Sequence, residues 1–111
     1  MVSVLKSLTP DIVGTVISTK LDAREGGDVI GFVEFVERLS PEIRAELLAV
    51  LWLGQEKGKR SEYEIQMRYA RRHLDDCGEY LDGLQHEMLI GYLLSGMVIL
   101  MLPGLSKHRS N

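Results

Sequence analysis

The feature that most constrains the fold is an uninterrupted run of seven apolar residues that ends at Leu53. Ser40 and Pro41 form a helix-start signal before it, with Ser40 as N-cap and Pro41 at the first helical position. A helix over residues 41–53 then carries apolar side chains on every side and needs partners on more than one side. We therefore predict the central helix of a small bundle. Gly54 is expected in the left-handed position that closes it.

Two helices are expected before this one. Thr9 as N-cap and Pro10 at the first helical position start a helix over residues 10–24. Lys20 lies near its end, where the helix dipole favours a cation. The segment 28–40 is rich in valine and phenylalanine, but adjacent apolar pairs break the alternation of a strand and follow helical spacing. It is therefore predicted to be helical.

Two more helices are expected after the central one. Ser61 and Glu64 match a capping box and begin a helix that runs to about Cys77. Its expected inward side chains are Ile65, Tyr69, Ala70, His73 and Cys77. A short helical turn precedes a final helix over residues 84–102. The sequence thus predicts an all-α, single-domain bundle of four to five helices.

Length and composition agree with one folded domain. The chain of 111 residues is expected to form a single domain, 1–111, with a core at about 9–102 and flexible termini at 1–8 and 103–111. A net charge of −3 gives no long-range attraction to nucleic acid or to an anionic membrane. Cys77 is the only cysteine, which excludes an intrachain disulfide and fits a reducing cytoplasm.

A second apolar run, residues 89–105, holds 17 uncharged residues. At 1.5 Å per residue it reaches about 26 Å, against about 30 Å for a bilayer core, and glycine, serine and proline interrupt it. We expect a buried or interface helix, with membrane association as the alternative. Its apolar side chains exceed what one small bundle covers, which predicts a homodimer. The interface candidates are Trp52, Tyr92, Met97, Leu100 and Met101.

Three stretches of the chain are similar to one family: "LLAVLWLGQ" (47–55), "YARRH" (69–73) and "GEYLDGLQHEMLIGYLLSG" (78–96). They resemble a bacterial family of small helical proteins that form a domain of unknown function. Its members carry a leucine-rich helix ending in Trp-Leu-Gly-Arg-Gly, then Tyr-Leu-x-Gly and Tyr-Leu-x-x-Gly. The resemblance implies a helical fold and a cytoplasmic bacterial setting, but no reaction. Gln55-Glu56 stands where the family has Arg-Gly.

Six of the thirteen cations lie between residues 57 and 72. Arg68, Arg71 and Arg72 would share one helical face that could grip phosphates. Glu64 is favourably spaced to pair with Arg68, and no aromatic interleaving suits base stacking. We therefore expect a solvated face, with a protein contact and weak nucleic-acid binding as alternatives. The partner-binding candidates are Lys59, Arg60, Arg68, Arg71 and Arg72.

His73, Asp76 and Cys77 are the candidates for a metal site or a Cys/His enzyme. On one helix, His73 and Cys77 would share a face and could offer nitrogen and sulfur to zinc. One histidine and one cysteine make half a zinc site, and a buried lone cysteine is usually inert. Helix-end acids and a core-facing His/Cys pair explain the same residues. We therefore assign no catalytic, cofactor-binding or metal residue, and no cofactor.

Trp52 is expected to pack in the core with its N–H bonded to a nearby carbonyl, or else to anchor an interface. Taken together, these features predict a non-enzymatic, cytoplasmic interaction or adaptor protein that acts as a homo-oligomer. Its protein partner would bind the basic face or the acidic turn at residues 78–87. The alternatives are a metal-dependent or Cys/His enzyme centred on His73–Cys77, and a weak nucleic-acid binder through Arg68, Arg71 and Arg72.

Overall fold

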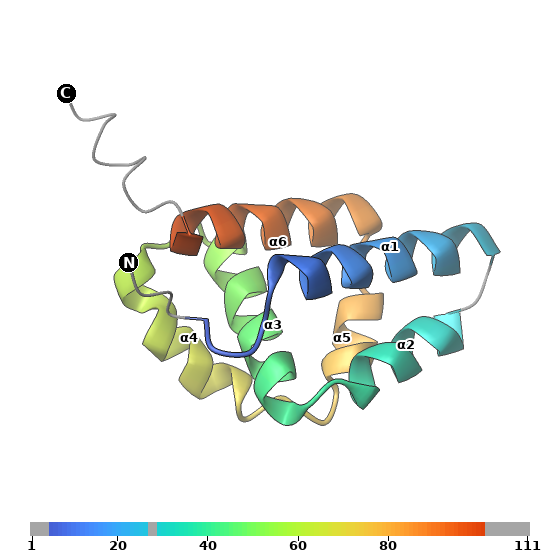
Figure 1. Ribbon diagram of the computed structural model, residues 1–111, viewed down its shortest axis with the longest axis horizontal. Coiled ribbons are helices and arrows are strands. Elements are labelled where there is room, and N and C mark those ends of the chain that lie inside the picture. The colour runs from blue at the N-terminus through green and yellow to red at the C-terminus, as the bar shows by residue number, and fades with distance from the viewer. Residues whose placement is uncertain (1–4, 27–28, 102–111) are drawn as a thin grey trace.

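The computed structural model describes residues 5–26 and 29–101, and all regular structure within them is helical (Figure 1). The elements are α1 (Pro10–Gly26), α2 (Val29–Arg38), α3 (Pro41–Gln55), the short 3-10 helix η1 (Arg60–Glu62), α4 (Tyr63–Ala70), α5 (Cys77–Asp82) and α6 (His86–Met101). The predicted all-α fold is confirmed. The expected end of the last helix at Leu102, and the termini 1–4 and 103–111, lie outside the described residues.

Helix α3 stands at the centre of the bundle (Figure 1). It packs against α6 on one side and α4 on another, while α2 packs against both α1 and α5. Helices α1 and α6 lie side by side, and α6 also crosses α3. The Ser40 hydroxyl accepts the Ile43 N–H at 3.2 Å, and Pro41 opens the helix as predicted. Every residue from Ala45 to Leu51 is buried, which confirms the central position.

Glu46 is a charged residue directly before the apolar run 47–53, and it is only 1% exposed. Its carboxylate accepts three backbone N–H groups: from Lys6 at 2.8 Å, Ser7 at 2.9 Å and Leu8 at 2.7 Å. A buried carboxylate needs such donors, because unpaired it would lose its hydration without replacement. The segment before α1 is thereby held on α3, and the packed region begins before residue 9, with Leu8 buried.

Helix α3 ends later than predicted, and Gly54 is not its left-handed residue. Gly54 is helical and buried, and the residue with positive φ is Lys57, at 53°. The Lys57 N–H bonds to the Gly54 carbonyl at 3.3 Å, and the Gly58 N–H to the Leu53 carbonyl at 2.9 Å. These two bonds form a Schellman motif, which satisfies carbonyls of the last turn.

Gly54 is a glycine because α6 crosses α3 at that point. A Cβ atom on Gly54 would collide with the Tyr92 carbonyl oxygen and lie 2.7 Å from the Gly96 nitrogen. A Cβ atom on Gly96 would in turn collide with the Val50 carbonyl oxygen. The two helices therefore touch through their backbones, which only glycine at both positions permits.

The predicted helix over residues 61–77 is wrong at both ends. The capping bond lies two residues earlier, at the start of η1, where the Glu62 Oε1 accepts the Lys59 N–H at 2.6 Å. At the start of α4 the N-cap is Glu62, without a side-chain capping bond, so Ser61 and Glu64 do not form the expected box. Helix α4 ends at Ala70, and the chain turns before α5 begins at Cys77. The turn brings α5 onto α2. A Cβ atom on Gly78, the second residue of α5, would lie 2.8 Å from the Val33 carbonyl oxygen of α2.

Candidate functional site

Of the five side chains predicted to point inward, Ala70 and Cys77 are buried, whereas Ile65, Tyr69 and His73 are exposed. Tyr63, Met67 and Ala70 are buried, whereas Ile65 is 51% and Tyr69 is 53% exposed. Both sets recur at helical spacing, and the contact between α4 and α3 buries the first set. An aromatic side chain is thereby left on the surface next to the end of α3.

A shallow groove of about 340 Å³ lies there, and we call it the Trp52 groove. Its lining comes from the last turn of α3, from α4 and from the turn after α4: Trp52, Gln55, Glu56, Gln66, Tyr69 and His73. Gln55-Glu56 is one of the two places where the sequence is expected to depart from the family pattern; the other is Ser95 with the apolar tail 97–102. The departure at Gln55-Glu56 therefore falls on a surface where side chains of three segments converge.

Trp52 lines the groove, is half-buried, and has partners that hold its ring. Its Nε1–H donates to the Tyr80 hydroxyl at 3.0 Å, rather than to a carbonyl as predicted. The His73 ring lies edge-on at 6.1 Å and 89°, and the Tyr80 ring at 6.1 Å and 71°. Such edge-to-face arrangements are favourable for aromatic pairs. The indole is thus fixed between α4 and α5 with part of its surface exposed.

The outer face of α6 is the second surface that carries large apolar side chains. Met88, Leu94, Val98 and Met101 are 44–50% exposed. Together with the exposed Gly91 and Ser95 they line one side of the helix, and we call these six residues the α6 stripe. Of the predicted interface candidates on this helix, only Met101 belongs to the stripe. Met97 and Leu100 are buried within the chain, and Tyr92 is half-buried.

The predicted basic face is not one helical face, because α4 ends before Arg71 and Arg72. Arg71 pairs with Glu42 of α3 at 3.7 Å, an exposed ion pair. The expected pair between Glu64 and Arg68 is absent from the described residues, although both side chains are exposed. Lys59 and Arg60 belong to the loop and the short 3-10 helix before α4. The five candidates therefore come from a loop, the 3-10 helix η1, α4 and the turn after α4 rather than from one helix.

His73 and Cys77 do not share a helix, because the turn after α4 separates them. His73 is exposed on the Trp52 groove, whereas Cys77 is buried. Burial raises the pKa of the Cys77 thiol to about 12, so the thiol stays protonated near neutral pH. Within the ranges 5–26 and 29–101, no three His, Cys, Asp or Glu side chains are grouped as metal ligands, Asp76 included.

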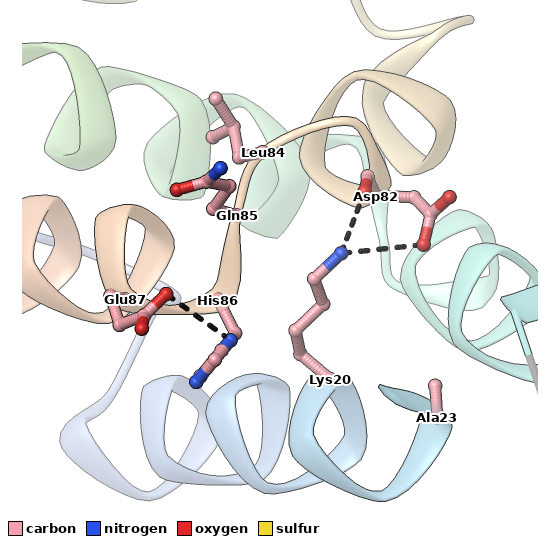
Figure 2. A pocket seen from close by; sticks show the side chains of 7 residues that line it. All are labelled: Lys20, Ala23, Asp82, Leu84, Gln85, His86 and Glu87. Atoms are coloured by element: carbon pink, nitrogen blue, oxygen red, sulfur yellow. Dashed lines mark hydrogen bonds and ion pairs between the residues drawn. The ribbon is translucent and has the colours of Figure 1, made fainter. Parts of the chain in front are cut away.

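A larger hollow, of about 550 Å³, lies between α1 and the connection from α5 to α6 (Figure 2). Lys20 rises from α1 into it and is only 8% exposed. Its ammonium donates to the Asp82 carbonyl at 2.6 Å, lies 3.4 Å from the Asp82 carboxylate, and sits 5.2 Å from the centre of the Phe32 ring. Lys20 thus caps α5 rather than the end of its own helix, and its role is structural.

The fold and these surfaces define a small all-α domain with an aromatic groove and an apolar helix face. The chain belongs to the DUF3775 family, which is described as a protein of unknown function. The family model matches residues 31–101. Comparison with curated proteins found no match, and comparison with solved structures found none. In the described ranges, α6 and the other helices fall short of the length and apolarity that a membrane span requires.

Sequence reasoning missed the groove, although two signals pointed to it. Tyr69 and His73 are spaced four residues apart, so on any helix they face the same way. Gln55-Glu56 stood out against the family pattern. What could not be read from the chain was that α3 continues to Gln55, which places these polar residues beside Trp52.

Proposed function

We propose that the protein is a non-enzymatic protein-interaction module that works as a homodimer, joined through the α6 stripe. The observation that carries this proposal is the stripe itself: four large apolar side chains about half exposed along one helix. Exposed apolar patches of this kind mark interaction surfaces. From Met88 to Met101 the helix carries no charged residue, so covering it desolvates no charge.

The order of residues along the stripe favours a second copy of this chain as the partner. In an antiparallel pair, with a two-fold axis between residues 94 and 95, each stripe residue faces another stripe residue. The facing pairs, one residue from each copy, are Met88 with Met101, Gly91 with Val98, and Leu94 with Ser95. The two inner pairs set a large side chain against a small one, which allows close packing.

The middle of the stripe leaves room for such an approach. A Cβ atom on Gly91 would meet nothing within 4 Å, so the surface there is open. One helix pair covers less than the roughly 800 Å² per partner of a standard interface. We therefore expect a weak dimer, with a dissociation constant in the micromolar range or above.

Sedimentation equilibrium at concentrations up to about 0.5 mM tests the proposal. The wild type is expected to associate, and Leu94→Glu to remain monomeric because it places a charge at the centre of the contact. Ile65→Glu is the matched control, since it adds the same charge at an equally exposed apolar residue on α4. A wild type that is monomeric throughout, or equal behaviour of the two variants, would contradict the proposal.

A cytoplasmic setting forms part of this proposal. Its support is the lone Cys77, which is buried and unpaired with any other cysteine. Fractionation of native cells, followed by detection of the untagged chain, tests it. Recovery outside the cytoplasmic fraction would contradict it.

A further inference from the structure

None of the residues that line the Trp52 groove belongs to the α6 stripe, so the proposed dimer contact does not use the groove. We infer that it binds an arginine side chain of a partner protein, and this inference rests on the proposed interaction function. A shallow groove of about 340 Å³ suits one inserted side chain better than a whole cofactor. Tryptophan, tyrosine and arginine are the residues that most often anchor protein interfaces, which fits an aromatic host and an arginine guest.

The aromatic walls match a flat cation. The Trp52 and His73 rings meet at 89°, so two walls of the groove stand nearly at right angles. Tyr69, one helical turn before His73, lines the same groove with half of its surface exposed. A guanidinium group can stack on the face of one aromatic ring while its N–H groups extend past the edge of the neighbouring ring. The bond from Trp52 to Tyr80 keeps the indole in place before anything binds.

The polar groups of the groove supply acceptors for the same cation. Glu56 is exposed, and its Oε1 accepts the Gln66 amide at 3.1 Å. Among the described residues no hydrogen bond reaches Oε2, so this atom can accept from a guanidinium. A carboxylate and a guanidinium match in geometry as well as in charge. Gln55 and Gln66 add amide oxygens that accept but carry no charge.

Charge complementarity extends beyond the groove. Residues 73–101 run from the groove through α5 and α6 and contain no lysine or arginine. Their five acids are Asp75, Asp76, Glu79, Asp82 and Glu87. Three cations are next to groove residues in the chain, but none of them lines the groove: Lys57 follows Glu56, Arg68 precedes Tyr69, and Arg72 precedes His73. The surroundings on the α5 side therefore attract a basic segment, and the acidic turn contributes to steering it.

Trp52 is the only tryptophan, so its fluorescence reports on the groove alone. The probe is a capped Gly-Arg-Gly peptide titrated into the full chain, and its control is the same peptide with citrulline, which keeps the shape but not the charge. The arginine peptide is expected to give a saturable change with a dissociation constant in the millimolar range. An equal response to citrulline, or no saturable response, would overturn the inference.

Two variants locate the binding. Tyr69→Ala and Glu56→Gln are each expected to raise the dissociation constant at least about fivefold, because each removes one interaction with the cation. Ile65→Ala, on the same helix and equally exposed, is expected to leave it unchanged. Unchanged binding in both groove variants would overturn the inference.

Failure of the dimer and failure of the groove are distinguishable. Leu94→Glu removes the α6 contact and is expected to keep the arginine response. Glu56→Gln weakens the arginine response and is expected to keep the sedimentation behaviour of the wild type. Loss of the arginine response in Leu94→Glu would show that the groove depends on the dimer. It would overturn the inference that the groove binds arginine independently of the α6 contact.

Discussion

Gly54 of α3 and Gly96 of α6 lie backbone to backbone where the two helices cross, with the Gly96 nitrogen 2.7 Å from the position of a Cβ atom on Gly54. Both glycines end a motif on which the resemblance to the family rests, Trp-Leu-Gly and Tyr-Leu-x-x-Gly. The crossing gives these motifs a physical role in the fold.

Gly54→Ala is therefore expected to lower the free energy of unfolding by about 3 kcal/mol or more, because the helices must separate to admit a methyl group. Urea unfolding measures the change. Gly14→Ala is the control, since a Cβ atom there meets nothing within 4 Å and the change adds about 0.5–1 kcal/mol of helix propensity. Equal stability of the two variants would contradict the close backbone contact between α3 and α6.

Glu46→Gln is expected to release the segment before α1. The amide nitrogen of glutamine repels N–H donors, and the remaining bonds lose their charge, at a cost of about 2–3 kcal/mol. Hydrogen exchange should accelerate at Lys6, Ser7 and Leu8. Glu42→Gln removes an exposed ion pair and one charge in the first turn of α3, and should change stability by about 1 kcal/mol at most. Persistent protection at residues 6–8 in Glu46→Gln would count against this anchor.

Because the Cys77 thiol is buried, we expect the protein to lose stability at alkaline pH. Burial raises its pKa to about 12, Arg44 opposes the rise and Glu37 adds to it. Between the ordinary value near 9 and this raised value, the folded chain holds a proton that the unfolded chain has lost. Stability is therefore complete below pH 9 and falls as the pH rises, by at most about 1.4 kcal/mol per unit.

Urea unfolding of the wild type and of Cys77→Ala at about pH 8 and 10 isolates this contribution. The stability difference between the two proteins is expected to shrink by about 1 kcal/mol at the higher pH. Burial also raises the pKa of Tyr63, with Glu46 adding to the effect, but this group acts in both proteins. A constant difference would contradict the prediction.

Local signals were predictable from the sequence, and the orientation of short helices was not. Thr9 and Ser40 cap their helices as expected, because a cap involves residues three positions apart. Helix α4 offers two stripes of similar apolarity, and only the position of α3 decides that Met67 is buried and Tyr69 exposed. Lys20 was likewise misassigned, because its partner lies 62 residues away in the chain.

The central claim, that a second copy covers α6 in antiparallel register, is tested most directly by crosslinking. Ser95→Cys places thiols beside the two-fold axis, whereas Met101→Cys places them about 20 Å apart, since residue 101 faces residue 88 of the other copy. A bismaleimide that reaches about 10 Å should crosslink the first variant and not the second, with buried Cys77 silent in both. Crosslinking of neither variant, or of both equally, would contradict the claim.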